Sequence, residues 1–144
     1  KMPLGLVAGD KPDAQATGAI ALGAAILAAL GTHDVGQSVI VQNGRVIAIE
    51  AAEGSDAMIA RATSLLDPTG GIACLVKMSK SAQDSRLDMP VIGCNTIKTA
   101  AKAGLLLLAV EADAVLLADD IAAIKALCTA HGVTLIGIVS CTTS

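Results

Sequence analysis

Five ionisable side chains fall between Lys77 and Asp88, in a stretch of twelve residues that follows an apolar run. The run at 72–76 is typical of a buried strand, so the polar stretch begins where this strand would end. Open α/β sheets bind their ligands at the carboxyl ends of strands. Lysine and arginine neutralise phosphate oxygens, and carboxylates bind hard divalent cations. These residue types therefore predict a site for a phosphate and a divalent metal.

The spacing within this stretch fits that chemistry. Asp84 and Asp88 are four residues apart, which places two carboxylates on one face of a helical turn or lets them converge from a loop. Lys77, Lys80 and Arg86 supply the positive charge for a phosphate. A solvated loop with loose ion pairs has the same composition, so the residues alone leave both interpretations open.

A second candidate is the stretch 50–56, which follows an expected strand and precedes an expected helix. The backbone N–H groups at the start of a helix attract anions, and Gly54 lets a ligand approach closely. The alternative is ordinary capping, in which Ser55 caps the helix and Asp56 interacts with its dipole. Judged on the residues alone, capping is the favoured interpretation.

The elements that must position these residues alternate between strands and helices. Asn43-Gly44 between two aliphatic runs indicates a β-hairpin, and Gly31 is expected to end the first helix. Strands are expected at 4–8, 38–42, 45–49, 72–76, 105–110, 114–117 and 133–139. Helices are expected at 13–30, from Ser55 to about 66, from Asn95 to Gly104, and from Asp119 to about 132. This order predicts a single α/β domain with a mixed, largely parallel sheet, one β-hairpin and flanking helices.

Composition narrows the function classes. The 144 residues carry a net charge of −3 and no aromatic side chain, and the pI of about 5.1 argues against nucleic-acid binding. The four cysteines form no CxxC pair, so we expect buried thiols in a reducing, cytoplasmic setting rather than a zinc site. The apolar stretch 19–30 is too short to span a bilayer, and we expect no signal peptide.

Several blocks of the sequence, taken in order and spacing, resemble one known family. It is the LpxI family, the UDP-2,3-diacylglucosamine pyrophosphatases of lipid A biosynthesis. The resemblance covers the family's C-terminal domain from about Pro12 to Ile138. It rests on the blocks VGQSVIVQNG at 35–44, IEAAEGSDAMI at 49–59, KSAQDSRLDMPVIG at 80–93 and AVEA at 109–112, together with Val76-Lys77 and Ala103-Gly104.

The resemblance implies a hydrolase that cleaves the pyrophosphate of UDP-2,3-diacylglucosamine, with water attacking the α-phosphorus. It implies Mg²⁺ or Mn²⁺ as cofactor, and lipid X (2,3-diacylglucosamine 1-phosphate) and UMP as products. Asp84 is expected to be the essential carboxylate, with Asp88 as helper or second metal ligand and Glu53 in support of the metal. The residues expected to hold the phosphates are Lys77, Lys80, Gln83 and Arg86, with N–H groups at Gly54 and Ser55.

Two departures from the family pattern qualify these expectations. The family has Lys-Pro-Gly-Gln-Asp where this chain has KSAQD at 80–84, which changes the backbone options of the loop. Family members also carry an N-terminal domain, of which residues 1–11 resemble only the start, so that 12–144 form the C-terminal domain. The alternative function is therefore a non-catalytic lipid-phosphate binding domain that needs the missing domain for turnover. A weaker alternative is a nucleotide-sugar binding domain of another class. Peripheral contact with the inner-membrane surface and homo-oligomer formation stay open.

Overall fold

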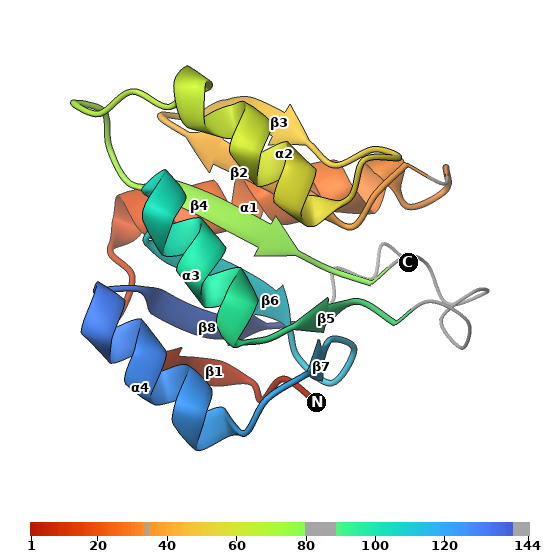
Figure 1. The fold of residues 1–144 in the computed structure, drawn as a ribbon. Helices are drawn as coiled ribbons and strands as arrows, with labels where there is room; N and C mark the ends of the chain where they lie inside the picture. Colours follow the sequence, from red (N-terminus) through yellow and green to blue (C-terminus); the bar gives the residue numbers. More distant parts are fainter. Residues whose placement is uncertain (34, 80–88, 140–144) are drawn as a thin grey trace.

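A six-stranded sheet forms the centre of the protein (Figure 1). The computed structural model describes residues 1–33, 35–79 and 89–139. The order across the sheet is β1-β8-β6-β4-β2-β3. The strands are β1 (Gly5–Ala8), β2 (Ser38–Gln42), β3 (Arg45–Ile49), β4 (Ala73–Lys77), β6 (Leu107–Glu111) and β8 (Thr134–Ile138).

Strand directions differ between the centre of the sheet and its flanks. β4, β6 and β8 are parallel to one another, whereas β2 is antiparallel to β4 and to β3, and β1 is antiparallel to β8. The predicted hairpin joins β2 to β3, and Asn43 and Gly44 have φ values of 54° and 71°. Two positive φ values are what a two-residue hairpin turn of this kind requires. The predicted α/β fold with a mixed sheet, one hairpin and flanking helices is confirmed.

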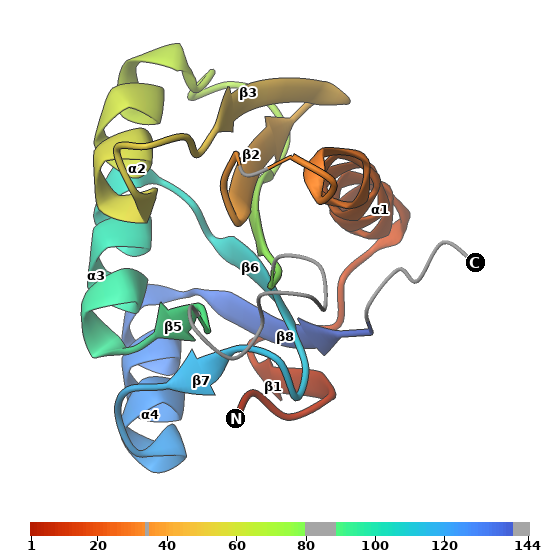
Figure 2. The same cartoon turned by 90° about the vertical axis from the view of Figure 1, so that its right-hand side faces the viewer.

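Helices cover the two faces of the sheet unequally (Figure 2). One face is covered by α2 (Ser55–Ala62), which continues into a 3₁₀ turn, by α3 (Cys94–Ala103) and by α4 (Ile121–His131). The other face carries only α1 (Ala14–Leu30), which packs on β2 and β4. Its close approach depends on Gly23, where a Cβ atom would lie 2.5 Å from Cγ2 of Val76. In the described part of the chain, no helix has the length and apolarity needed to cross a membrane.

A second, two-stranded sheet lies beside the main one. β5 (Val91–Ile92) pairs in parallel with β7 (Leu116–Leu117). The predicted strand at 114–117 therefore exists, but it does not join the main sheet. The assignment of residues 1–11 to the start of another domain stays a prediction. In this structure β1 lies within the main sheet, paired with β8.

The helix starts differ from the prediction at three positions. The residue before α2 is Gly54, so Ser55 is the first helical residue rather than the cap. α3 begins at Cys94 rather than at Asn95, and its Cys94 N–H is bonded to Asp119 Oδ2 at 2.7 Å. Asp119 was expected to cap α4, but it is used by α3 instead, and Asp120 precedes α4 without a side-chain cap bond. For Ser55 and Asp119, a tertiary contact takes the side chain that a local rule assigns to the cap.

Candidate functional site

The carboxyl ends of the parallel strands form one edge of the sheet, and two charged residues lie there. Lys77 is the last residue of β4, and Glu111 is the last residue of β6. Lys77 is aligned with Val110, so Glu111 lies one residue further along. β3 runs in the same direction as β4 and leads, at this edge, through Gly54 into α2. The sheet thus brings Lys77 and the start of α2 to the same edge, although the residues alone gave them as two separate candidates.

The two charged side chains lie on opposite faces of the sheet. Side chains alternate along a strand, so Lys77 shares a face with Leu75, in the core beneath α2, α3 and α4. Glu111 shares a face with Ala109, in the core beneath α1. Lys77 is 8% exposed and Glu111 is 6% exposed. Ionised groups are seldom buried to this degree unless they have partners, so the partners of each indicate what it does.

Lys77 lies in a hydrogen-bonded cluster that joins four elements. Its Nζ is 3.2 Å from Oγ of Ser55, the first residue of α2. Ser55 Oγ donates to Oε2 of Glu50 at 2.9 Å and lies 3.2 Å from Oγ of Ser38, the first residue of β2. The cluster of Ser38, Glu50, Ser55 and Lys77 therefore ties β4 to β2, to the end of β3 and to α2.

The single proton of the Ser55 hydroxyl determines which group donates and which accepts in each of these hydrogen bonds. A serine hydroxyl has one proton to donate and two lone pairs to accept with. Ser55 gives its proton to Glu50, so both lone pairs are filled, one by the ammonium of Lys77 and one by the hydroxyl of Ser38. Ser55 is thus an acceptor toward Lys77 and holds that ammonium at the start of α2.

The start of α2 is itself suited to an anion. Gly54 precedes the helix with φ 87° and ψ 170°, and as a glycine it supplies no side-chain cap bond. That conformation is nearly restricted to glycine, and a Cβ at this position would meet no atom within 4 Å. The first N–H groups of a helix have no partner within the helix and carry a partial positive charge. An ammonium and an uncapped helix start therefore adjoin each other, which is an arrangement that binds a phosphate.

Glu53 has a different partner from the one predicted. Its Oε1 forms an ion pair with Nη2 of Arg61 at 2.8 Å, and the same guanidinium nitrogen donates to the carbonyl of Ile49 at 3.1 Å. A role for Glu53 as a metal ligand would require this pair to open, and it stays a prediction. Among the described residues, no group of three or more His, Cys, Asp or Glu side chains could hold a metal ion.

The remaining predicted site residues cannot be placed. Lys80, Gln83, Asp84, Arg86 and Asp88 lie outside the described residues, so their assignments stay predictions. Of the predicted phosphate-binding residues, Lys77, Gly54 and Ser55 are described. The structure brings these three together at one edge.

Sequence reasoning missed Ser38 and Glu111 at this edge, and it gave no role to Glu50, although Glu50 lies in the candidate stretch 50–56. Glu50 orients Ser55, Ser38 completes the cluster, and Glu111 accepts two hydrogen bonds from Ser79. Glu111 carried a signal, because it is an ionisable residue at the end of the apolar run 105–110. Ser38 carried none, because its role depends on tertiary contacts across 17 residues.

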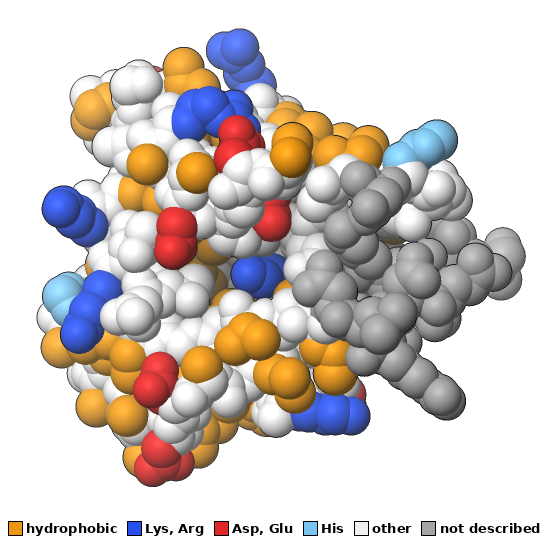
Figure 3. Space-filling model, turned by 45° about the vertical axis from the view of Figure 1, so that its right-hand side comes forward, with side chains coloured by type: hydrophobic (Ala, Val, Ile, Leu, Met, Phe, Trp, Pro, Cys, Tyr) orange, Lys and Arg blue, Asp and Glu red, His pale blue; other side chains and the backbone are white. Residues whose placement is uncertain are grey.

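On the face drawn in Figure 3, charged side chains of both signs are present and do not form one patch of a single sign. Figure 3 shows acidic and basic side chains interspersed, with hydrophobic side chains between them. The described residues drawn on this view form no broad basic surface that would suit a polyanion. Recognition of a single phosphate by Lys77 and the start of α2 agrees with this distribution better than nucleic-acid binding does.

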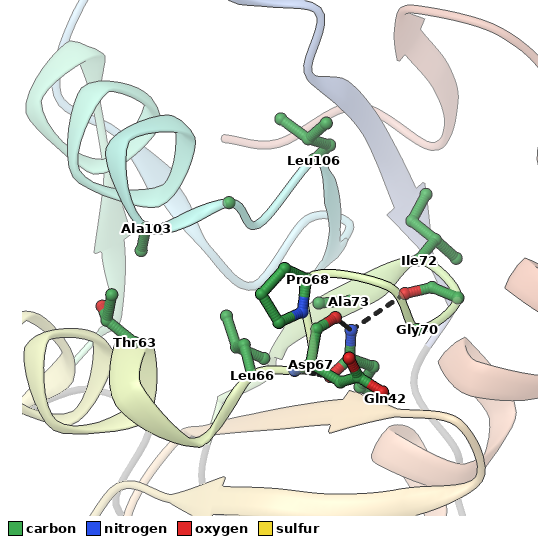
Figure 4. A pocket seen from close by; sticks show the side chains of 12 residues that line it. Gln42, Thr63, Leu66, Asp67, Pro68, Gly70, Ile72, Ala73, Ala103 and Leu106 are labelled. Atoms are coloured by element: carbon green, nitrogen blue, oxygen red, sulfur yellow. Dashed lines mark hydrogen bonds between the residues drawn. The ribbon is translucent and has the colours of Figure 1, made fainter.

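A pocket of about 560 Å³ lies at the opposite edge of the sheet (Figure 4). Its walls come from the turn before β4 and from the residues between α3 and β6, including Leu66, Pro68, Ile72 and Leu106. Ala73 and Lys77 are the two ends of β4, so the pocket is about 13 Å from the Lys77 cluster at 3.3 Å per residue.

The pocket is lined by apolar groups and by polar groups that already have partners. Gln42 donates to the carbonyls of Asp67 and Gly71 and accepts from Asp67 N. The Asp67 carboxylate accepts from the hydroxyl and the N–H of Thr69, and these bonds lower its pKa. Among the described residues that line the pocket, none is a lysine or an arginine. A phosphate is therefore better matched by the other edge.

The three described cysteines are poor candidates for the chemistry. Burial raises the pKa of the Cys74 thiol to about 12. Burial, and then the neighbouring Asp119 carboxylate, raise the pKa of Cys94. Burial likewise raises the pKa of Cys128, with Cys94 nearby. Thiols held in the protonated form are poor nucleophiles and poor metal ligands, so none of the three is a candidate for the chemistry.

Comparison with known proteins finds matches to one family. The family model described as the LpxI C-terminal domain matches residues 3–136. A protein of Caulobacter vibrioides named UDP-2,3-diacylglucosamine pyrophosphatase LpxI is 40% identical over 102 residues. The aligned part is 67% of this chain but 36% of that relative, so the chain spans well under half of the relative's length. The chain belongs to the LpxI family, and it corresponds to the family's C-terminal domain.

Proposed function

We propose that this chain binds the phosphate groups of UDP-2,3-diacylglucosamine and takes part in its hydrolysis to 2,3-diacylglucosamine 1-phosphate and UMP. Family membership and the printed name of the Caulobacter relative support the substrate. In the proposed reaction a water oxygen bonds to the α-phosphorus, and the bond from that phosphorus to the bridging oxygen breaks. The bridging oxygen leaves with the lipid phosphate. The reaction would take place in the cytoplasm, at or near the inner-membrane surface where a diacylated substrate resides.

One observation carries this proposal: the buried Lys77 ammonium is held beside the uncapped start of α2. Both groups are fixed before any ligand arrives, Lys77 by Ser55 and α2 by its packing on the sheet. Positive groups fixed in this way stabilise charge on phosphate oxygens without first having to reorganise. The hydroxyl of Ser55 has its proton and both lone pairs in use, so we assign it to positioning Lys77 and not to nucleophilic attack.

The proposed metal rests on Asp84 and Asp88 of the sequence. The described residues do not by themselves fit Mg²⁺ or Mn²⁺, because they offer no cluster of three ligands and because Glu53 is paired with Arg61. A divalent ion held by Asp84 and Asp88 would supply Lewis-acid stabilisation of phosphate charge.

A second candidate function follows from the share of the relative that the chain covers. The aligned residues are 36% of the Caulobacter protein, so a site shared between two domains would be only partly present here. Water that enters a half-built site raises the effective dielectric and weakens its electrostatics. We therefore propose that the 144-residue chain binds lipid X but releases UMP slowly, or not at all, without the rest of a family member.

Two measurements separate these functions. UMP release with Mg²⁺ or Mn²⁺ is followed for this chain and for a chimera in which it replaces the matching residues of the Caulobacter relative. UMP release by the chimera but not by the 144-residue chain supports a site shared between two domains. If neither protein releases UMP, the hydrolytic function is contradicted. Lipid X is also titrated calorimetrically into Lys77→Gln and into Lys102→Gln, an exposed lysine in the last turn of α3 that gives the same change of charge.

The expected difference between these two variants is large. A hydrogen bond to a charged group contributes about 1.5–3 kcal/mol, so Lys77→Gln should weaken lipid X binding about 10- to 150-fold. Lys102→Gln should change the affinity less than about twofold. Equal affinities of the two variants for lipid X would show that the phosphate does not bind at Lys77.

A further inference from the structure

One stretch of chain holds both ends of the segment 80–88. The stretch from Glu111 to Ala118 follows β6 and contains the turn that leads into β7. Its first residue contacts Ser79, the last described residue before the segment. Its final residues contact Pro90 and Ile92, just after the segment. In the sequence, the residues predicted to bind phosphate and metal therefore lie between two anchors, one at Ser79 and one at Pro90 and Ile92. Both anchors are made by the stretch from Glu111 to Ala118.

The first anchor is made by a side chain. Oε2 of Glu111 accepts from the backbone N–H of Ser79 at 2.7 Å and from its hydroxyl at 3.0 Å. A carboxylate that accepts from an amide and a hydroxyl makes charge-assisted bonds, about twice as strong as neutral ones. Both bonds go to one residue, so they fix both the place and the orientation of the backbone where the chain leaves β4.

The second anchor is made by the backbone. Leu116 N–H donates to the carbonyl of Pro90 at 2.9 Å, and Ala118 N–H donates to the carbonyl of Ile92 at 2.8 Å. These bonds join β7 to β5 and do not depend on the identity of any side chain. The second anchor therefore stays in place when Glu111 is replaced, and it provides an internal control.

Burial of Glu111 is not explained by stability. Glu111 lies on the face of the sheet beneath α1, whose apolar core includes Met78 and Ala109. Taking a carboxylate out of water costs several kcal/mol, and buried charges are often no better for stability than apolar residues of similar size. A buried carboxylate whose two bonds both go to the residue that begins a functional segment is better explained by positioning.

We propose that Glu111 is a positioning residue, which through its two bonds to Ser79 fixes the backbone where the chain leaves β4, two residues after Lys77. This inference rests on the proposed function for its effect on ligand binding, but the contact itself is testable without a ligand. A direct role in binding a ligand or a metal is the alternative. The two differ in whether reach or charge matters: Glu111→Gln keeps the reach to Ser79 and loses the charge, whereas Glu111→Asp keeps the charge and loses the reach.

Amide hydrogen exchange of the 144-residue chain tests the contact. In Glu111→Asp and Glu111→Ala the Ser79 amide should exchange at least about tenfold faster than in the wild type, because its acceptor is gone. In Glu111→Gln it should stay within about threefold, since the amide oxygen still accepts. The amides of Leu116 and Ala118 should be unchanged in all three, which shows that the fold is intact. Unchanged exchange of Ser79 in Glu111→Ala would overturn the proposal.

Lipid X titration with Mg²⁺ or Mn²⁺ tests the consequence. Glu111→Asp and Glu111→Ala should weaken binding at least about tenfold, and Glu111→Gln should stay within about threefold. Asp120→Asn, an exposed acidic residue at the start of α4, is the control for charge and should bind as the wild type does. Normal binding by Glu111→Asp with weak binding by Glu111→Gln would overturn the proposal in favour of a direct charge role. If the wild-type chain binds no lipid X, the proposed function fails, and hydrogen exchange still decides whether Glu111 positions Ser79.

Discussion

Ser55→Ala is the substitution that most directly tests the hydrogen-bonded cluster at the sheet edge. It removes one oxygen atom, which donates to Glu50 at 2.9 Å and accepts from Lys77 and Ser38, each at 3.2 Å. Alanine is well tolerated in the first turn of a helix, so α2 itself should persist. The loss of stability should therefore come from three groups that lose a partner.

The size of this loss can be worked from the contacts. Two of the three bonds involve a charged group, for which about 1.5–3 kcal/mol each is typical, and a neutral bond contributes about 0.5–1.5 kcal/mol. Ser55 is only half-buried, so water can replace part of what is lost, and two of the bonds are long. We expect a loss of about 2–4 kcal/mol in the free energy of unfolding. For a chain of this length that corresponds to a fall in Tm of about 7–13 °C.

The assay is urea unfolding of Ser55→Ala beside Ser64→Ala. Ser64 is exposed, and its hydroxyl lies 3.5 Å from the carbonyl of Arg61, so its loss should cost less than about 0.5 kcal/mol. The slope of the free energy against urea should be the same in both variants, because the surface exposed on unfolding is the same. A loss below about 1 kcal/mol in Ser55→Ala would refute the reasoning, since it would mean that Lys77 and Glu50 are held by other groups.

Three further predictions concern the site and its surroundings. Asp84→Ala, made in the chimera with the Caulobacter relative, should cut UMP release at least about a hundredfold without unfolding the protein; near-normal release from a soluble, metal-replete variant would remove Asp84 from its assigned role. Gly54→Ala should destabilise the chain by about 1–3 kcal/mol, because the backbone conformation at Gly54 is nearly restricted to glycine, and thermal melting measures it. Asp119→Asn should lower the pKa of Cys94 by removing a neighbouring negative charge, so alkylation of Cys94 at pH 8, followed by peptide mass spectrometry, should become faster; an unchanged rate would show that burial alone sets that pKa.

Local sequence rules predicted the parts of the fold that local chemistry decides. Asn43-Gly44 specifies its own hairpin turn, because both residues tolerate positive φ. Asp13 caps α1 through a bond to Ala16 N at 2.8 Å, three residues away. In both cases the interacting groups are neighbours in the sequence, so the pattern contains the whole interaction.

Tertiary contacts decided the rest. Ser55 resembles a helix cap, but its hydroxyl is engaged by Glu50 and Lys77, and Gly54 takes the cap position. Asp119 caps α3 from 25 residues away, which no rule based on nearby residues can anticipate. The contact of Glu111 with Ser79 spans 32 residues.

For the site, the sequence placed Lys77 at the end of a strand from the apolar run before it, and the structure has Lys77 as the last residue of β4. That this edge binds the ligand stays a prediction. The residue types of the sequence could not show that Glu53 pairs with Arg61, because a carboxylate suits a guanidinium and a metal equally well. The assignments within 80–88 stay predictions.

The central claim is that a phosphate binds between Lys77 and the start of α2, and amide chemical-shift mapping with lipid X tests it most directly. The account predicts that the largest shift changes occur at the amides of Gly54, Ser55 and Asp56, whose N–H groups begin the helix. It predicts little change at Gly70 and Gly71, which line the pocket at the opposite edge. Large changes at Gly70 and Gly71, with none at the start of α2, would contradict it.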